Sequence, residues 1–341
     1  MSKIRVAING FGRIGRAFFK LAQEFDELEI VAINDLGDEE NLAYLLKYDS
    51  AYGRSRLDVK AAEGKLIVNG KEIAFLQQKD PSQLPWRDMN INVVLESTGF
   101  FTTYEGAKLH LDAGAKRVVI SAPAKGDPVP GVASATVLMG VNNDALKTCQ
   151  ISSNGSCTTN AASPVMQIMH ENIGVEKAML NTVHGYTASQ NIQDGPSKDY
   201  RRGRAAAANI IPTTTGAAIA VTKANPELEG KFDGMAMRVP LLVGSVADIT
   251  LVTKRDTSEE EINNIFRKAA QEDRWQGILA VTEDPIVSAD IVGERFGAIV
   301  DLGFTKVVGG NLVKVLSWYD NEMGYTNTLV KHVLETGKYT K

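Results

Sequence analysis

Residues 3–15 read Lys3-Ile4-Arg5-Val6-Ala7-Ile8-Asn9-Gly10-Phe11-Gly12-Arg13-Ile14-Gly15. A short apolar strand runs directly into the pattern G-x-G-x-x-G, and residues 16–24 then show the apolar spacing of a helix. In this setting Gly10 permits a tight turn, Gly12 lets a pyrophosphate approach the backbone, and Gly15 brings the helix against the strand. The N–H groups at the start of the helix favour an anion. The segment therefore predicts a dinucleotide site formed by Gly10, Phe11, Gly12, Arg13, Ile14 and Gly15.

A second apolar strand, residues 28–33, supports the same interpretation because it ends at Asn34-Asp35. Asp35 lies 20 residues after Gly15, where a carboxylate can accept a hydrogen bond from the adenosine ribose 2′-OH. The same negative charge would repel a 2′-phosphate. The sequence therefore favours NAD over NADP as the cofactor.

Two later strands, residues 93–96 and 117–120, also run into small polar residues. In an open parallel sheet, ligands bind beyond the carboxyl ends of the strands. We therefore expect these loops, with Ser97, Thr98, Gly99 and Ser121, to flank the cofactor. Lys79 stands in a turn and can reach the adenine, although a solvated surface lysine fits the pattern equally well.

The composition sets the class of protein. A chain of 341 residues is too long for one ordinary core, so two domains are expected. Its net charge of −4, with dispersed Lys and Arg, argues against a nucleic-acid partner. No stretch approaches the roughly 20 apolar residues of a membrane span, and the N-terminus lacks the apolar run of a secretion signal. With only two cysteines and four histidines, we expect reduced thiols, a cytoplasmic protein and no metal site.

One of the two cysteines stands in the run Ser156-Cys157-Thr158-Thr159-Asn160, between an apolar stretch and a helical pattern. A reactive thiolate needs an accessible, electropositive site. A helix N-terminus stabilises an anion by only about 0.3–1 kcal/mol. A positive charge about 4 Å away gives about 4 kcal/mol at an effective dielectric of 20. Cys157 is therefore predicted to be the nucleophile and to need a cationic partner.

His184 is the predicted partner because it ends a strand-like run, residues 179–183, and can project into a site. His110 and His332 fall in predicted helices with polar neighbours and are weaker candidates. The sequence thus predicts a thiolate–imidazolium ion pair between Cys157 and His184.

A phosphate site is predicted further along the chain. Residues 185–209 form a long polar loop containing Thr187 and Arg202, and Thr215 and Gly216 then open an alanine-rich helix over residues 217–224. Hydroxyls, a helix N-terminus and nearby arginines together favour phosphate. Arg238 lies inside an apolar strand, residues 235–240, and should therefore have an anionic partner.

These motifs together resemble those of the phosphorylating glyceraldehyde-3-phosphate dehydrogenases, over essentially the whole chain. The resemblance is carried by Asn9 to Arg16, Ser156 to Asn160, His184, Asp194-Gly195-Pro196, Arg201-Arg202, Thr213 to Gly216, Arg238-Val239-Pro240 and Tyr319-Asp320-Asn321-Glu322.

The resemblance implies an α/β fold with two domains. An N-terminal Rossmann domain, residues 1–156, would hold a doubly wound parallel sheet and be completed by a C-terminal helix, residues 322–341. Residues 157–321 would form an α+β catalytic domain with a mixed or antiparallel sheet. The family also implies a homotetramer. The apolar spacing of residues 325–336 predicts that the C-terminal helix is apolar on one face only.

The resemblance further implies a covalent oxidation shared by glycolysis and gluconeogenesis. Cys157 would attack the aldehyde of glyceraldehyde 3-phosphate with His184 as base, a hydride would pass to NAD, and inorganic phosphate would cleave the resulting thioester to give 1,3-bisphosphoglycerate. By analogy Thr187, Arg202 and Arg238 would bind the substrate phosphate, and Ser156, Thr158, Thr215 and Gly216 the attacking phosphate. Asn321 would hold the nicotinamide carboxamide, with Tyr325 beside it.

Several positions depart from the usual family pattern. Ala161 stands where many members carry a second cysteine, Met323 replaces a common tryptophan, and residues 241–244 replace a stretch that usually resembles Thr-Pro-Asn-Val. The alternative family is erythrose-4-phosphate dehydrogenase, which shares the fold, thiol and cofactor. Aspartate-semialdehyde dehydrogenase is a more distant alternative, with a different cysteine motif.

Overall fold

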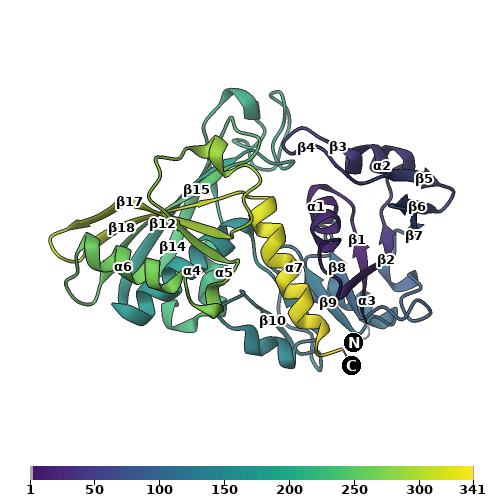
Figure 1. The fold of residues 1–341 in the computed structure, drawn as a ribbon, viewed down its shortest axis with the longest axis horizontal. Coiled ribbons are helices and arrows are strands. Elements are labelled where there is room, and N and C mark those ends of the chain that lie inside the picture. Colours follow the sequence, from purple (N-terminus) through teal and green to yellow (C-terminus); the bar gives the residue numbers. More distant parts are fainter. Residues whose placement is uncertain (1–2, 341) are drawn as a thin grey trace. The chain divides into compact units, whose positions relative to one another are not determined.

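The computed structural model describes residues 3–340 and divides them into two compact units. The first unit comprises residues 3–137, 143–155 and 329–340, and the second comprises residues 138–142 and 156–328. Figure 1 labels most of the helices and strands of both units.

The first unit is built on a nine-stranded sheet whose order is β10-β11-β9-β8-β1-β2-β7-β6-β5. The strands are β1 (Ile4–Asn9), β2 (Leu28–Asn34), β5 (Val59–Ala62), β6 (Lys65–Val68), β7 (Lys71–Leu76), β8 (Val93–Glu96), β9 (Arg117–Ile120), β10 (Ser134–Thr136) and β11 (Ile151–Ser153). Every pairing from β10 to β7 is parallel, whereas β5, β6 and β7 pair antiparallel at one edge. The doubly wound parallel sheet is confirmed, and the antiparallel edge is an addition that the sequence analysis did not predict.

The order of the strands creates a switch point between β1 and β8. From β1 the chain proceeds through β2 to β7 on one side, and only then places β8, β9, β11 and β10 on the other. Ligands of open α/β sheets bind at such a point, beyond the carboxyl ends of the strands. Asn9 and Glu96 end the two strands and are register partners across this point.

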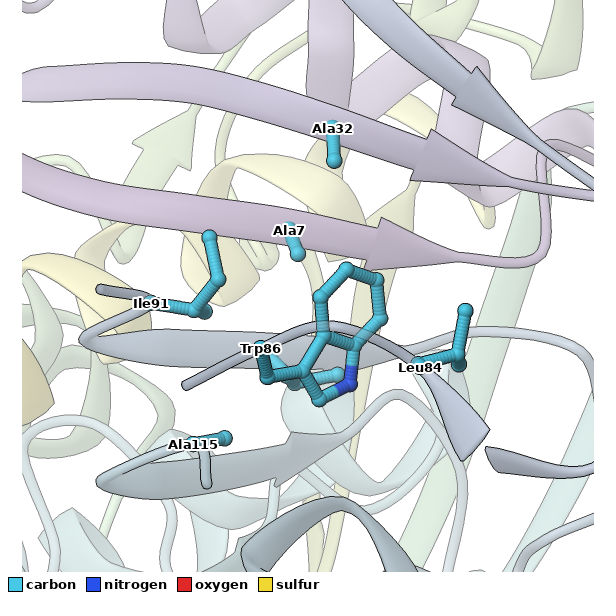
Figure 2. Close-up of a cluster of buried hydrophobic side chains, with 7 residues drawn as sticks. Ala7, Ala32, Leu84, Trp86, Ile91 and Ala115 are labelled. Carbon is cyan, nitrogen blue, oxygen red and sulfur yellow. The ribbon is translucent and has the colours of Figure 1, made fainter. Parts of the chain in front are cut away.

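One cluster of buried apolar side chains packs against the central strands of this sheet and is centred on Trp86, which is fully buried. Figure 2 shows its indole beside Ala7 of β1 and Ala32 of β2, with Leu84 and Ile91 around it. The two small alanines leave room for the large ring, which satisfies the close packing of protein interiors.

The helices of the first unit are α1 (Arg13–Ala22), α2 (Glu39–Lys47) and α3 (Tyr104–Asp112), with a two-stranded ribbon of β3 (Tyr48–Asp49) and β4 (Gly53–Arg54) after α2. Helix α2 is capped by the Asp38 carboxylate and α3 by the Thr103 hydroxyl, each accepting from a backbone N–H three residues on. His110 lies on α3, as expected from the helical pattern, and is completely buried.

The last helix, α7 (Met323–Gly337), begins in the second unit and ends in the first. Its prediction as a one-faced amphipathic helix is wrong. Leu329, Val330 and Val333 are buried, but so are the polar Thr326, Thr328 and His332. Polar side chains can be buried when they form hydrogen bonds, and the Thr326 and Thr328 hydroxyls donate to backbone carbonyls of this helix segment.

His332 forms a buried polar group with the strand that precedes Cys157. Its Nε2 lies 2.7 Å from the Ser152 hydroxyl, and its Nδ1–H donates to the Asn154 amide oxygen at 3.0 Å. Burial lowers the pKa of His332 to about 3. The imidazole is therefore neutral in the folded protein under physiological conditions.

This shift predicts an acid-dependent loss of stability. Between about pH 6.5 and pH 3 the unfolded chain binds a proton at His332 that the folded chain does not, so the free energy of unfolding falls as the pH falls through this window. The contribution is about 1.4 kcal/mol per pH unit for one proton. His332→Gln should flatten the slope of stability against pH by about that amount, measured by urea unfolding from pH 4 to 8. Above pH 7.5 the free energies of unfolding of the wild type and the variant should differ by a constant amount. If the two free energies also ran parallel against pH below pH 6, the prediction would be contradicted.

The second unit contains a seven-stranded mixed sheet with the order β13-β14-β12-β15-β18-β17-β16. Its strands are β12 (Val175–Gly185), β13 (Ile211–Thr214), β14 (Phe232–Val239), β15 (Ser245–Thr253), β16 (Leu279–Thr282), β17 (Ala298–Val308) and β18 (Leu312–Tyr319). Only the pairs β12–β14 and β16–β17 are parallel. The expected mixed sheet is confirmed.

Three helices, α4 (Cys157–Asn172), α5 (Ala217–Ala224) and α6 (Glu259–Ala269), cover one face of this sheet. Helix α4 lies between the other two and contacts β12, β15, β17 and β18 (Figure 1). Its first residue is Cys157, so the sheet and its helices together fix where the cysteine stands.

Within residues 3–340, no helix is both long and apolar enough to cross a membrane. Nowhere in the described chain do three His, Cys, Asp or Glu side chains gather as metal ligands would.

Candidate active site

Cys157 is held at the N-terminus of α4 by a reciprocal cap. The Ser156 hydroxyl accepts from the Thr159 N–H, and the Thr159 hydroxyl accepts from the Ser156 N–H, each at 3.1 Å. This capping box fixes the direction of the first helical turn. Cys157 as a whole is partly exposed at the start of the helix.

His184 contacts the thiol directly. Its Nε2 lies 3.2 Å from Cys157 Sγ, and its Nδ1 lies 2.6 Å from the Gly185 carbonyl oxygen. The ring is almost completely buried and meets the Tyr319 ring edge-on, with centroids 5.9 Å apart. His184 is the penultimate residue of β12, so the strand delivers it as the sequence analysis expected.

Arg238 is the fixed positive charge of this site. It lies on β14 as the register partner of His184, so the two side chains emerge side by side from parallel strands. Its Nη1 contacts His184 Nδ1 and donates to the Gly185 carbonyl oxygen at 3.0 Å. No Asp or Glu of residues 3–340 forms an ion pair with Arg238, so the expected anionic partner is not a protein carboxylate. A half-buried guanidinium with no carboxylate is suited to bind an anionic ligand.

The electrostatics of the pair differ from the predicted ion pair. Burial, and then the charge of Arg238, lower the pKa of His184 to about 3. Burial raises the pKa of the Cys157 thiol, and the charge of Arg238 opposes that rise. Both shifts favour a neutral thiol beside a neutral imidazole. The positive charge near the sulfur therefore belongs to Arg238, and the neutral imidazole of His184 has one ring nitrogen that can accept a proton.

Tyr319 is a member of the site to which sequence reasoning gave no role. Its buried hydroxyl lies 2.8 Å from the hydroxyls of both Thr158 and Thr182. These three residues come from β18, α4 and β12, so the phenol ties the start of the cysteine helix to the sheet. Burial raises the pKa of Tyr319, which keeps its hydroxyl protonated. Only the position of Tyr319 beside Asp320-Asn321 hinted at a function.

The other residues of the predicted phosphate sites lie near the same edge of the sheet. Arg202 donates to the Thr213 hydroxyl at 2.8 Å and to the Thr214 carbonyl at 3.3 Å. Besides burial, the charge of Arg202 is one cause that lowers the pKa of Arg238, so the two cations are close enough to interact. Thr215 and Gly216 directly precede α5, and the Thr215 hydroxyl accepts from the Ala217 N–H.

Three of the side chains predicted to contact phosphate already have partners within the protein. The hydroxyl of Ser156 caps α4 and that of Thr158 contacts Tyr319. The Thr187 hydroxyl lies 2.9 Å from that of Ser189 and has no direct contact with Arg238 among the described residues.

The first unit contains the predicted nucleotide loop in the required conformation. Gly10 has φ +96°, and a Cβ there would lie 2.5 Å from the Thr98 N atom. A Cβ on Gly15 would lie within 2.2 Å of the Gly10 carbonyl oxygen, a close approach that only glycine allows. Both glycines thus serve the tight turn and the helix–strand packing that the pattern predicted.

Comparison with known proteins settles the family. Residues 4–104 match the sequence model described as "Glyceraldehyde 3-phosphate dehydrogenase, NAD binding domain", and residues 156–321 match the corresponding C-terminal domain. Similar curated proteins include the glyceraldehyde-3-phosphate dehydrogenases of Thermotoga maritima and Geobacillus stearothermophilus. They are 51% and 48% identical over 96% of this chain, and the alignments cover 97% and 96% of the relatives. The chain belongs to this family.

The glyceraldehyde-3-phosphate dehydrogenase family implies bound NAD, and the residues of the first unit fit it. Within residues 3–340 nothing lies within 4 Å of the place where a Cβ on Gly12 would stand, and no side chain caps the first turn of α1. That open backbone at a helix N-terminus suits a pyrophosphate. Asp35 follows β2, and its carboxylate accepts from the N–H groups of Phe11 and Gly37 at 2.6 and 2.8 Å. The acidic group is thereby fixed beside the glycine turn.

The other residues that the sequence predicted to lie at the cofactor differ in their surroundings. Ser97 donates to the Gly10 carbonyl oxygen at 2.6 Å, whereas Lys79 is exposed after β7. Ser121 follows β9, and its N–H donates to the Glu96 carbonyl.

Asn321, the predicted nicotinamide ligand of the family, is held in one orientation. Its Oδ1 accepts from the Gly244 N–H at 3.1 Å and from the Ser245 hydroxyl at 3.0 Å. The amide nitrogen therefore points away from these donors. Tyr325 lies one turn further along and is buried. Ser245 is also bonded to Gly185, the neighbour of His184, because its hydroxyl accepts the Gly185 N–H at 3.2 Å.

Proposed function

We propose that this protein is an NAD-dependent, phosphorylating glyceraldehyde-3-phosphate dehydrogenase. The proposal is carried by the contact of 3.2 Å between Cys157 Sγ and His184 Nε2, with Arg238 beside it, in a chain of this family. A thiol with a proton acceptor and an adjacent cation is equipped for covalent attack on an aldehyde.

In the proposed reaction, Cys157 Sγ bonds to the aldehyde carbon while His184 Nε2 takes the thiol proton. His184 returns this proton to the carbonyl oxygen, which gives a hemithioacetal. His184 then accepts the hydroxyl proton while the carbon gives up a hydride, which leaves a thioester on Cys157. NAD, when bound, supplies the hydride acceptor. Inorganic phosphate then attacks the thioester carbon and releases Cys157 and the acyl phosphate. We assign His184 as the base because its Nε2 faces the thiol, and the Gly185 carbonyl oxygen, 2.6 Å from Nδ1, can accept the ring proton of the neutral imidazole.

We assign the substrate phosphate to Arg238, Arg202 and Thr187, and the attacking phosphate to the residues around the starts of α4 and α5, namely Ser156, Thr158, Thr215 and Gly216. The lack of a protein carboxylate on Arg238 supports the first assignment. Two helix N-termini near hydroxyl groups support the second.

We further propose that Asn321 donates its amide N–H to the nicotinamide carboxamide, oriented by Ser245. Ser245→Ala should lower kcat/KM for NAD about tenfold, since it removes one of the two donors that orient Asn321. Ser317→Ala is the matched control, because Ser317 is also a buried serine of this sheet and donates to the Ala161 carbonyl. If steady-state kinetics showed that kcat/KM for NAD falls equally in both variants, the assignment would be contradicted.

The proposed function is tested by NAD reduction with glyceraldehyde 3-phosphate and with erythrose 4-phosphate, each with and without inorganic phosphate or arsenate. We expect phosphate-dependent turnover and a higher kcat/KM for the three-carbon substrate. Turnover independent of phosphate would refute the acyl-phosphate mechanism. A preference for the four-carbon sugar would favour the erythrose-4-phosphate dehydrogenase alternative.

We also propose a homotetramer in the cytoplasm, acting in glycolysis or gluconeogenesis, with residues 1–156 and 322–341 as the NAD domain and 157–321 as the catalytic domain. Large apolar side chains of the second unit support a subunit contact, since Ile192, Tyr200 and Ile210 are 86%, 89% and 67% exposed. The free cysteines are compatible with a reducing compartment. Light scattering would measure the subunit number.

A further inference from the structure

A buried carboxylate stands at the switch point of the first unit, directly behind the predicted cofactor loop. Glu96 ends β8, pairs in register with Asn9 of β1, and is 1% exposed. Glu96 has no role in the proposed reaction. No lysine or arginine of residues 3–340 forms an ion pair with this carboxylate, although a buried charge ordinarily requires a partner.

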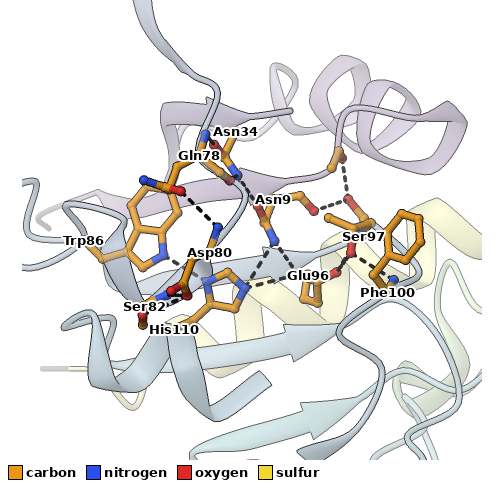
Figure 3. A network of polar contacts seen from close by, with 12 residues as sticks. Asn9, Asn34, Gln78, Asp80, Ser82, Trp86, Glu96, Ser97, Phe100 and His110 are labelled. Atoms are coloured by element: carbon orange, nitrogen blue, oxygen red, sulfur yellow. Dashed lines mark hydrogen bonds and ion pairs between the residues drawn. The ribbon is translucent and has the colours of Figure 1, made fainter. Parts of the chain in front are cut away.

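Hydrogen-bond donors surround both oxygens of Glu96. Oε1 accepts from the Thr98 N–H at 2.8 Å and from the Thr98 hydroxyl at 2.5 Å. Oε2 accepts from the Asn9 amide at 2.5 Å and lies 3.1 Å from His110 Nε2 (Figure 3). Asn9 can only present its N–H₂ group here, because its Oδ1 accepts from Asn34 at 2.7 Å.

The indole of Trp86 determines which ring nitrogen of His110 carries a proton. Its Nε1–H donates to His110 Nδ1 at 3.0 Å, so Nδ1 carries no proton (Figure 3). A neutral imidazole then has its proton on Nε2, which donates to Glu96. The contact is therefore a hydrogen bond from a neutral histidine. Every neighbour of Glu96 is a donor, so the side chain is an ionised carboxylate.

The carboxylate controls the conformation of the loop after β8. The Thr98 hydroxyl donates to Glu96 and accepts the Phe100 N–H at 3.0 Å, which closes the turn over residues 97–100. The Thr98 backbone packs against Gly10, and the Ser97 hydroxyl donates to the Gly10 carbonyl oxygen. The loop after β8 and the glycine turn after β1 are thus held together at the place where a dinucleotide binds.

We propose that Glu96 is a positioning residue for NAD, whose charge gathers Asn9, Thr98 and His110 and so holds residues 97–100 against the glycine turn. Only a carboxylate accepts at both of its oxygens. Glutamine would place an N–H₂ group against the existing donors and free one side of the network. The proposal rests on NAD binding by the first unit and is independent of which aldehyde is oxidised.

The first test is Glu96→Gln, with NAD affinity measured by titration of the full-length protein without aldehyde. We expect the Kd and the KM for NAD to rise at least about tenfold. The KM for glyceraldehyde 3-phosphate and the alkylation rate of Cys157 without NAD should stay within twofold. A folded variant with an unchanged Kd for NAD would overturn the proposal. Equal rises in the KM for NAD and the KM for glyceraldehyde 3-phosphate would also overturn it.

Asp301→Asn is the matched control. Asp301 is likewise a buried carboxylate, but it lies in the second unit, where it accepts the indole N–H of Trp318 at 3.0 Å. Its replacement should lower stability and leave the Kd for NAD unchanged. A rise in Kd equal to that of Glu96→Gln would show that any buried carboxylate has this effect, and would overturn the proposal.

If Glu96→Gln does not fold, Thr98→Val and Thr98→Ser carry the test. Valine keeps the shape but loses the hydroxyl, and should raise the Kd for NAD, whereas serine should restore it. The indole N–H resonance of Trp86 gives an independent readout, since NAD should shift it in the wild type and less in Thr98→Val. Equal affinities of the valine and serine variants would refute the proposal. Absent turnover with normal NAD affinity would count against the proposed function alone.

Discussion

Replacement of Cys157 by serine is expected to lower turnover by at least about 10⁴-fold while leaving NAD binding intact. The thiolate is the nucleophile of the proposed reaction, and an alcohol at the same place ionises far less readily. The glycine turn, Asp35 and the loop after β8 belong to the first unit, so their contacts do not depend on the sulfur. Steady-state NAD reduction and NAD titration of the same preparation measure both effects.

Cys149→Ser provides the control for that loss. Cys149 is buried in the first unit, and burial raises the pKa of its thiol. A protonated, inaccessible thiol is a poor nucleophile, so the change should alter kcat by less than about twofold. Inactivation by Cys149→Ser with retained activity of Cys157→Ser would mean that the wrong thiol has been assigned.

The sequence predicted the parallel part of the first sheet because its strands are apolar runs bounded by glycine and polar residues. Strands buried on both faces have that composition. The antiparallel edge formed by β5, β6 and β7 escaped prediction because these strands are short and alternate with Lys, Glu and Gly. Short strands at a sheet edge carry little periodicity to detect.

Some residues of the candidate site could likewise be predicted from the sequence, whereas others could not. Cys157 and His184 were identifiable because each ends or begins a regular element, and their types limit the chemistry. The position of Arg238 beside His184 follows from the parallel pairing of β12 with β14 across more than 50 residues, and no local pattern encodes that register. The neutral state of the Cys157–His184 pair, where charges were expected, has the same origin, since burial and the neighbouring guanidinium exist only in the folded chain.

Tyr319 and Glu96 show why the contacts that support the site could not be predicted from the sequence. The hydroxyl of Tyr319 joins residues 158 and 182, and the carboxylate of Glu96 joins residues 9, 98 and 110. Each set meets only after distant strands have paired. A single sequence gives the chemical type of these residues, but their partners depend on topology.

His184→Asn is expected to lower kcat by about 10²–10⁴-fold, the usual contribution of a general base. Nε2 of the imidazole is 3.2 Å from the sulfur, and in the proposed reaction it accepts the thiol proton as the carbon–sulfur bond forms. Asparagine has no basic nitrogen, so the thiol would have to lose its proton to water. Because burial raises the pKa of Cys157, alkylation by neutral iodoacetamide should be slower near pH 7, and its pH profile should move to higher pH.

Arg238→Gln separates the role of the base from the role of the charge. The charge of Arg238 lowers the pKa of Cys157, so its loss should also slow alkylation at pH 7. Arg238 is in addition the proposed ligand of the substrate phosphate, so this variant should raise the KM for glyceraldehyde 3-phosphate, whereas His184→Asn should leave it nearly unchanged. An alkylation rate for His184→Asn equal to that of the wild type at pH 7 would contradict the assignment of His184 as base. The same rate with a raised KM would instead place His184 in substrate binding.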